Sequence, residues 1–210
     1  VTLADLPGTQ EVTTDDDTIE RRCKTGKPTV MVDLRVVDSE MNDLPRDGKS
    51  TGEVVIRAPW LTQGYTRNPE GSEDLWKGGY MHTGDVGYLD ADGSLQITDR
   101  IKDVIKSGGE WISSLALEDI VSRCEGVGEV AAFGIPDERW GERPMLVVVK
   151  AADDQGSLCV ESIQNAVRGE VDRGILSKWA IPQRIEFVDA IPKTSVGKLD
   201  KKVLRVMYED

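Results

Sequence analysis

Three short clusters in the 210-residue sequence combine residue types that could hold a nucleotide or stabilise developing negative charge. They occupy residues 80–85, 98–113 and 191–199. Each places a charged side chain near glycine, so the backbone can bend closely around a ligand that the side chain reaches. Each also has an ordinary structural explanation, so a functional interpretation needs more than one of them.

The first cluster reads Tyr80-Met-His-Thr-Gly-Asp85. An aspartate beside a glycine turn offers two acceptor oxygens to vicinal hydroxyl groups, which is how acidic residues hold a ribose. Asp85 is therefore a candidate nucleotide-binding residue. The alternative is that Asp85 only caps the turn before a strand that begins at Val86.

The second cluster is the segment 98–113, with the sequence TDRIKDVIKSGGEWIS. Arg100 could donate a planar fork of hydrogen bonds to hydroxyl or phosphate oxygens. Gly108 and Gly109 would let the backbone approach a ligand without obstruction by Cβ atoms. Trp111 would add an amphipathic aromatic wall. The alternative is a charged strand followed by a glycine hairpin.

The third cluster, residues 191–199, has the sequence IPKTSVGKL and presents Lys198 on a loop rich in serine and glycine. A mobile ammonium group suits negative charge that develops on a carboxylate or a phosphate. The loop lacks the GxxxxGK spacing of a Walker phosphate-binding loop. The alternative is that Lys198 is a solvated surface lysine.

The first half of the chain has the pattern of a β-rich unit. β-Branched and alternating apolar residues predict strands, and a turn at 90–93 predicts a hairpin between the last two of them. The predicted strands are 30–38, 53–57, 86–89 and 95–98. Eight glycine or proline residues between 64 and 93 separate short strands, which is typical of a small barrel or sheet.

The second half alternates helix and strand patterns. Ser113 and Ser114 are candidate helix N-caps, followed by Leu117 and further apolar residues at helical spacing until Gly126. Further helices are predicted at 163–171 and 200–207, and strands at 130–135, 145–150 and 184–188. The chain is therefore expected to be α+β, with two units joined near residue 102. The predicted division is a polar linker over 1–25, a β-rich unit over 26–101 and an α+β unit over 102–210.

Composition excludes several classes of function. A net charge of -12 disfavours binding to nucleic acid, and no apolar run is long enough to span a bilayer. Cys23, Cys124 and Cys159 are widely spaced and accompanied by a single histidine, so neither a disulfide framework nor a zinc site is supported. We interpret them as reduced thiols of a soluble, cytoplasmic protein.

Taken together and in this order, the clusters resemble motifs of the adenylate-forming superfamily, which contains acyl-CoA synthetases, luciferases and nonribosomal adenylation domains. The resemblance runs from about Gly26 to Arg205, and the stretch 108–118 is most similar to medium- and long-chain fatty acyl-CoA synthetases. Its matching segments are Gly26-Lys-Pro, Gly52-Glu-Val, Gly64-Tyr65, Thr83-Gly84-Asp85, Asp99-Arg100-Ile-Lys102-Asp103 and Pro192-Lys-Thr-Ser-Val-Gly-Lys198.

The resemblance implies an acid–thiol ligase that joins a fatty acid to CoA in two steps. The carboxylate first attacks the α-phosphorus of ATP to give acyl-AMP and pyrophosphate, and the CoA thiolate then displaces AMP. It implies that Asp85 and Arg100 hold the ribose of ATP or AMP, and that Lys198 bridges the carboxylate and α-phosphate oxygens as the catalytic residue. Neither step needs a covalent enzyme nucleophile, so catalysis would be positioning and charge stabilisation.

The resemblance also implies a large movement between the two steps. Lys102 would be the hinge about which residues 102–210 swing as a mobile C-terminal domain. The swing would remove Lys198 and bring Gly108, Gly109 and Trp111 to the channel for the pantetheine arm of CoA.

Two segments of that superfamily are absent from the sequence: the phosphate loop rich in serine, threonine and glycine, and a Tyr-Gly-x-Thr-Glu segment. Both lie upstream in the family, as do the expected Mg²⁺ ligands and most of the acyl pocket. Because the sequence also starts at Val1, without a Met, and leads into a polar stretch at 13–22, we expect the C-terminal part of a longer enzyme, with 26–101 closing its N-terminal domain. We expect these 210 residues alone to be inactive.

Other interpretations remain open at this point. One is the adenylation domain of a nonribosomal peptide or luciferase-type enzyme, and another is a non-catalytic nucleotide-binding module. The lysine motif also reads Ser-Val-Gly-Lys where many members of the superfamily have Ser-Gly-Lys. The sequence does not set the length of the acyl chain, and a homodimer is compatible with it.

Overall fold

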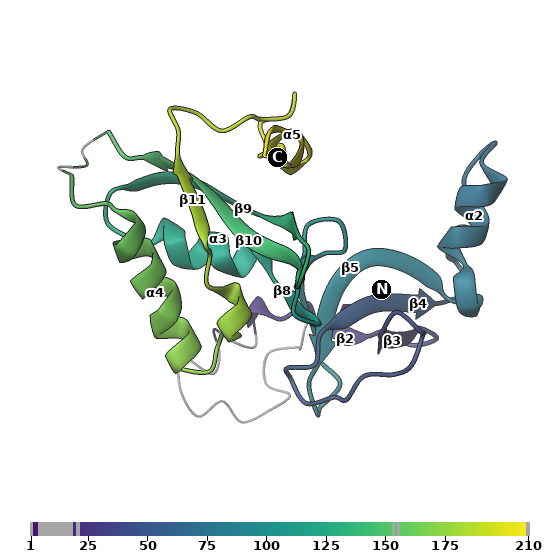
Figure 1. Cartoon of the computed structure of the whole chain (residues 1–210). Helices are drawn as coiled ribbons and strands as arrows, with labels where there is room; N and C mark the ends of the chain where they lie inside the picture. The colour runs from purple at the N-terminus through teal and green to yellow at the C-terminus, as the bar shows by residue number, and fades with distance from the viewer. Residues whose placement is uncertain (1, 4–18, 20–21, 153, 155, 209–210) are drawn as a thin grey trace. The chain divides into compact units, whose positions relative to one another are not determined.

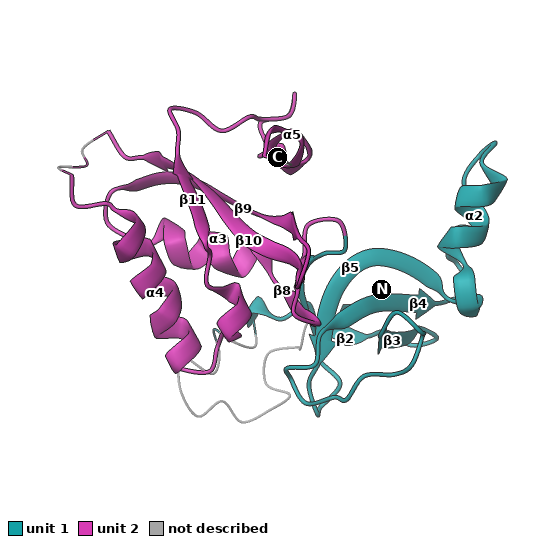
Figure 2. Cartoon of the chain, in the orientation of Figure 1, with its two compact units in different colours: residues 1–101 teal, residues 102–210 magenta. Residues whose placement is uncertain are grey.

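The computed structural model of the chain describes residues 2–3, 19, 22–152, 154 and 156–208. Most of the predicted linker over 1–25 lies outside the described residues. The chain divides into two compact units, residues 1–101 and 102–210 (Figure 2). Each unit has its own sheet and its own hydrophobic core.

The first unit is built on a four-stranded antiparallel sheet in the order β3–β4–β5–β6 (Figure 1). Its strands are β3 (Asp33–Val37), β4 (Gly52–Arg57), β5 (Met81–Leu89) and β6 (Leu95–Arg100), and a separate pair consists of β1 (Thr2–Leu3) and β2 (Lys27–Pro28). Each strand of this sheet pairs antiparallel with the next along the chain, and only β5 and β6 are joined by a short turn. The prediction of a β-rich first unit with a hairpin at 90–93 is confirmed.

Alternate residues of these strands form the core of the first unit. On β3 and β4 the buried residues of the cluster are two apart, which places them on one face of the sheet. The cluster consists of Leu34, Val36, Val54, Ile56, Leu89 and Leu95. Val37 and Val55, which point to the opposite face, are also fully buried, so the period of two determines which residues join this cluster.

A helix in the glycine-rich stretch was not predicted from the sequence. It is α2 (Pro69–Leu75), and a 3₁₀ turn, η1 (Lys77–Gly79), follows it. Asn68 is its N-cap, with Oδ1 accepting a hydrogen bond of 3.0 Å from the backbone N–H of Gly71. Proline at the first helical position has a suitable fixed φ and loses no intrahelical hydrogen bond. Asn68-Pro69 was therefore a helix-start signal within a stretch dominated by turn signals.

The second unit contains a mixed five-stranded sheet. Its strands are β7 (Ile105–Ser107), β8 (Glu110–Ile112), β9 (Val127–Asp137), β10 (Gly141–Lys150) and β11 (Arg184–Phe187). β10 is antiparallel to β9 and β7 and parallel to β11. The helices are α3 (Ser114–Ser122), α4 (Val160–Asp172) and α5 (Lys201–Met207), with a 3₁₀ turn η2 (Lys178–Ala180). The α+β prediction is confirmed.

Helices cover both faces of this sheet. On one face, Ala132 and Leu146 belong to a core that includes residues of α3 and α4. On the other face, Phe133 and Met145 belong to a core that includes Leu204 of α5. Successive side chains of a strand point to opposite faces of the sheet. Strands covered on both faces therefore have continuous runs of apolar residues in the sequence.

The start of α3 follows its sequence signal. Ser113 is the N-cap, and its Oγ accepts a hydrogen bond of 3.1 Å from the backbone N–H of Ala116. Leu117 and Val121, one turn apart, are fully buried against the sheet. The helix predicted from Ser113 and the apolar spacing is therefore confirmed.

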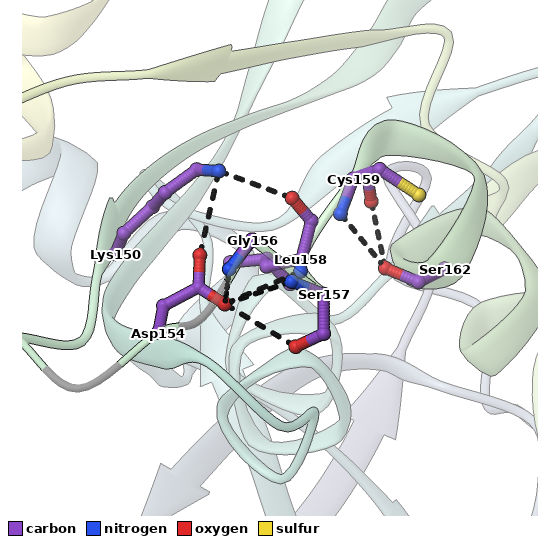
Figure 3. Close-up of polar contacts among 7 residues, drawn as sticks. All are labelled: Lys150, Asp154, Gly156, Ser157, Leu158, Cys159 and Ser162. Carbon is purple, nitrogen blue, oxygen red and sulfur yellow. Dashed lines mark hydrogen bonds and ion pairs between the residues drawn. The ribbon is translucent and has the colours of Figure 1, made fainter.

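The loop between β10 and α4 is closed by a buried carboxylate (Figure 3). Asp154 Oδ1 accepts hydrogen bonds from the backbone N–H groups of residues 156–158, and Lys150 Nζ lies 3.5 Å from its other oxygen. Burial alone would raise the pKa of Asp154, but these hydrogen bonds and the ammonium group lower it below its usual value. Next to it, Ser162 Oγ accepts from the backbone N–H of Cys159 at 3.1 Å and closes the first turn of α4.

Two global properties of the described residues bear on the wider predictions. None of their helices combines the length and the apolar character needed to cross a bilayer. Cys23, Cys124 and Cys159 are all free, and Cys23 and Cys159 are exposed.

Candidate functional site

The residues singled out from the sequence lie on five segments of the fold. Two are cross-strand neighbours in the first unit, and the others lie on a linking turn, a hairpin and a loop of the second unit. In that order they are Asp85 and Arg100; Lys102; Gly108, Gly109 and Trp111; and Lys198.

Asp85 and Arg100 face each other across β5 and β6. Arg100 Nε lies 3.2 Å from Asp85 Oδ1, so the structure brings the two predicted ribose-binding residues together. The Arg100 side chain is 63% exposed and that of Asp85 25%. An ion pair with so much access to water contributes at most about 1 kcal/mol to stability. The pair is therefore better suited to presenting donors and acceptors to a ligand than to stabilising the fold.

Asp85 lies at a β-bulge inside β5, a local turn of the strand backbone where its register with β4 shifts, and Thr83 holds this turn. Thr83 Oγ1 donates a hydrogen bond of 2.6 Å to the carbonyl oxygen of Val54 and accepts one of 3.1 Å from the backbone N–H of Asp85. Gly84 between them has φ of +70°, in the left-handed region that favours glycine. The threonine and glycine of this cluster thus fix the backbone from which the Asp85 carboxylate projects.

Glu53 supports the same turn from β4, and sequence reasoning gave it no role. Its Oε1 accepts a hydrogen bond of 3.4 Å from the backbone N–H of Gly84, and its Oε2 lies 2.8 Å from His82 Nδ1. The other ring nitrogen, His82 Nε2, lies 3.0 Å from the carbonyl oxygen of Lys77. The two contacts of Glu53 join residues 29 and 31 positions apart, so no local pattern in the sequence could predict them.

Gly108 and Gly109 form the two-residue turn between β7 and β8. Their φ values are +61° and +83°, and positive φ at both central positions defines a type I′ turn. The backbone N–H of Gly108 donates a 3.0 Å hydrogen bond to the carbonyl oxygen of Trp140. A Cβ atom at Gly108 would lie 2.7 Å from the indole of Trp179, whereas one at Gly109 would meet nothing within 4 Å. The turn therefore presents Gly109 outward and packs Gly108 against an aromatic ring.

Two tryptophans that sequence reasoning missed support this turn. The ring centroids of Trp140 and Trp179 are 4.4 Å apart. Arg139 lies over the ring of Trp140 at 4.6 Å, and Lys178 over that of Trp179 at 5.1 Å. A cation that is held over an aromatic face can still bind an anionic group of a ligand while it keeps its contact with the ring. The sequence signal would have been the repeated pairing of a cation with tryptophan, Arg139-Trp140 and Lys178-Trp179.

The packing of Gly108 gives a testable difference between two adjacent glycines. Alanine at either position forces a side chain into the left-handed region, at a cost of about 1–2 kcal/mol. Only at Gly108 does the new methyl group also collide with the indole of Trp179, which adds roughly 1–3 kcal/mol. In urea denaturation, Gly108→Ala should therefore lower the free energy of unfolding clearly more than Gly109→Ala. Equal losses would show that the indole moves away without cost.

Lys198 lies at the end of a compact loop. Thr194 N–H donates to the carbonyl oxygen of Lys198 at 2.7 Å, and Lys198 N–H donates to Thr194 Oγ1 at 3.2 Å. Gly197 has φ of +79° and closes the turn by donating its N–H to the carbonyl oxygen of Thr194 at 2.9 Å. Lys198 is exposed. The backbone of the loop is thus fixed while the side chain remains accessible.

Lys102 is the first residue of the second unit and is exposed in the turn between β6 and β7. Its neighbour Asp103 is paired with Arg205 of α5 at 3.4 Å.

Trp111 is half-buried on β8, with Lys106 over its ring at 5.2 Å. No group of three histidine, cysteine, aspartate or glutamate side chains that could hold a metal occurs in the described part of the chain.

Comparison with known proteins matches residues 116–198 to the family "AMP-binding enzyme C-terminal domain". The chain is 40% identical over 185 residues to 3-methylmercaptopropionyl-CoA ligase of Ruegeria lacuscaerulensis, covering 88% of this chain and 33% of that protein. It is 37% identical over 201 residues to the long-chain-fatty-acid–CoA ligase of Thermus thermophilus, covering 95% and 36%. The chain thus spans about a third of the length of these curated relatives.

A solved structure has the same fold. ATP-bound MatB from Rhodopseudomonas palustris aligns with a TM-score of 0.73 and 29% sequence identity. The alignment covers 89% of this chain and 36% of that one. Similarity to known proteins in sequence and in fold thus extends over about nine-tenths of the chain.

Proposed function

Because residues 116–198 match the AMP-binding enzyme C-terminal domain, we propose that the chain forms the C-terminal part of an ATP-dependent acyl-CoA synthetase. The proposed reaction converts a carboxylic acid, ATP and CoA into acyl-CoA, AMP and pyrophosphate through an acyl-adenylate. The identity of 37–40% with two CoA ligases, over about nine-tenths of the chain, is the observation that carries this proposal. Fatty acids are the proposed substrate class.

Asp85 and Arg100 are proposed to bind the ribose of the nucleotide. Their contact across β5 and β6 supports this role, because a carboxylate and a guanidinium side by side offer acceptors and donors to two vicinal hydroxyl groups. Thr83 and Glu53 would maintain the orientation of Asp85 through the turn that they hold.

Lys198 is proposed to act in acyl-AMP formation. The carboxylate and the α-phosphate both carry negative charge, so bringing their oxygens together is unfavourable. An ammonium group placed between them offsets that repulsion most strongly in the transition state. The exposed side chain on a backbone fixed by Thr194 and Gly197 supports this assignment.

Lys102 is proposed as the hinge for the movement between the two steps. After acyl-AMP has formed, the unit 102–210 would turn so that Lys198 leaves and the turn at Gly108 and Gly109 meets the pantetheine arm of CoA. The outward-facing Gly109 and the half-buried Trp111 suit a narrow, uncharged arm. The cations Lys106, Arg139 and Lys178 nearby suit the phosphate groups of CoA.

The Mg²⁺ ion expected with ATP is assigned to none of these residues. The described residues hold no cluster of three histidine, cysteine, aspartate or glutamate side chains that fits a metal. A cytoplasmic location is proposed because all three cysteines are free thiols. A homodimer stays a prediction.

The function is tested with the full-length enzyme that carries this chain. Purified protein, ATP, Mg²⁺ and a series of carboxylic acids of increasing length should release pyrophosphate only when an acid is present. Addition of CoA should then yield the thioester, measured by mass spectrometry. The 210-residue chain alone should give no thioester above a Lys198→Ala control. A folded full-length protein that releases no pyrophosphate with any acid would favour a non-catalytic nucleotide-binding module.

A further inference from the structure

Lys201 is a buried cation for which the proposed reaction has no role. It is the first residue of α5, three positions after Lys198, and its side chain is only 10% exposed. Its Nζ lies 2.7 Å from Glu118 Oε1 and 2.7 Å from Ser114 Oγ. Lysine is rarely buried to this extent unless it is paired. The two partners therefore account for its position.

The partners of Lys201 connect three elements of the second unit. Glu118 and Ser114 lie one turn apart on α3, and Glu118 is 14% exposed. Glu118 Oε1 also accepts a hydrogen bond of 2.8 Å from the backbone N–H of Ala132 on β9. One carboxylate oxygen thus joins α3, β9 and α5. Removal of the ammonium group would leave this carboxylate buried without its counter-charge, which is strongly unfavourable.

Two further residues attach α5 along the same side. Leu204 is almost fully buried in the core that contains Phe133, and Arg205 pairs with Asp103 at 3.4 Å. Residues at i, i+3 and i+4 lie on one side of a helix, so Lys201, Leu204 and Arg205 form a single docking face. A helix of seven residues is not stable by itself in water. Its geometry therefore depends on these three contacts.

The start of α5 is also the base of the loop that carries Lys198. The backbone N–H of Asp200 donates a 2.9 Å hydrogen bond to the carbonyl oxygen of Pro192, which closes the loop at its base. Asp200 Oδ1 caps α5 by accepting from the N–H of Val203 at 3.1 Å. A shift of α5 would therefore move the base of the loop and Lys198 with it.

From these contacts we propose that Lys201 is a positioning residue for Lys198, a role that rests on the function proposed above. Through Glu118 and Ser114 it fixes where α5 begins and so where the Lys198 ammonium group can reach. A displacement of about 1 Å at a reacting centre can cost on the order of 100-fold in rate. Lys201 itself touches no reacting atom in this scheme.

The test uses the full-length enzyme and separates the two half-reactions. Lys201→Met should lower kcat for acyl-AMP formation roughly 10- to 100-fold while the KM values for ATP and acid stay near wild type. CoA transfer from supplied acyl-AMP should be almost unchanged. Lys201→Arg should restore most of the rate, because a guanidinium also pairs with a carboxylate. The matched control is Lys202→Met, which removes the adjacent exposed lysine and should alter neither step.

A double substitution shows whether Lys201 acts through Lys198. If it does, Lys198→Ala combined with Lys201→Met should form acyl-AMP no more slowly than Lys198→Ala alone, because residues that act as one unit are not additive. A further large loss in the double variant would overturn the proposal. So would a Lys201→Met enzyme with a wild-type rate, or one in which both half-reactions fall equally together with the melting temperature.

The proposal remains testable if Lys201→Met fails to fold. Glu118→Gln keeps an acceptor for the Ala132 N–H and removes only the charge that faces Lys201, so it should show the same selective loss of acyl-AMP formation. A Glu118→Gln enzyme with both steps unchanged would overturn the proposal. A wild-type enzyme that forms no acyl-AMP would instead refute the proposed function, and this inference with it.

Discussion

Replacing Lys198 with alanine should slow acyl-AMP formation by about 10²- to 10³-fold, the usual cost of losing one contact to developing charge. In the proposed reaction the ammonium group would offset repulsion between carboxylate and phosphate oxygens as they meet. CoA transfer begins from a neutral acyl-adenylate carbonyl, after Lys198 is proposed to have moved away, so that step should stay nearly intact. Single-turnover measurement of each half-reaction in the full-length enzyme separates the two effects.

The matched control for this substitution is Lys193→Ala on the same loop. Lys193 is also an exposed lysine, but its Nζ is paired with Glu129 at 2.7 Å. Loss of an exposed ion pair costs at most about 1 kcal/mol, so acyl-AMP formation should change only a few-fold. Lys198→Ala enzymes in which both half-reactions fall together, or neither falls, would refute the catalytic assignment.

Proline at position 102 should impair one half-reaction and spare the other. Proline fixes φ near about -65°, so a hinge that needs two backbone conformations can adopt only one of them freely. If the other conformation is disfavoured by about 3 kcal/mol, the cost of a badly placed proline, its half-reaction should fall roughly 100-fold. Rates of pyrophosphate release and of thioester formation from acyl-AMP, measured on the Lys102→Pro full-length enzyme, give the two values.

Lys102→Ala is the control that separates backbone from side chain. It removes the same ammonium group but leaves φ unrestricted, so both half-reactions should remain near wild type if the residue acts as a hinge. Equal loss of both steps in a folded Lys102→Pro enzyme would instead indicate an ordinary surface turn. A large loss in Lys102→Ala would assign a chemical role to the side chain.

Elements with local signals could be predicted from the sequence. The N-cap Ser113 and the apolar spacing through Leu117 specify α3, and the runs at 130–135 and 145–150 specify two strands that are covered on both faces. Each of these signals involves residues that are close in sequence, within one or two helical turns or along a single strand. The helix α2 was missed because its cap, Asn68, lies in a stretch where glycine favours turns.

The support of the candidate site was much less predictable than its reactive residues. Lysine, arginine and aspartate beside glycine are visible as local motifs, whereas their supports come from distant segments. Lys201 contacts Ser114 across 87 positions, and the indole of Trp179 packs on Gly108. Only the fold brings these residues together, so one sequence without its structure does not identify them.

The order of strands in the two units has a consequence for how the chain emerges during synthesis. The first sheet is a meander in which β4, β5 and β6 each pair with the strand before them in the chain, so it can form before the second unit is synthesised. In the second unit, β11 must find β10, and Leu204 must reach the core around Phe133, after most of the chain has left the ribosome. In the sequence, the loop of Lys198 lies between β11 and α5, the helix that carries Leu204. The proposed nucleotide-binding strands can therefore form before the loop of Lys198 has gained its support from the rest of the second unit.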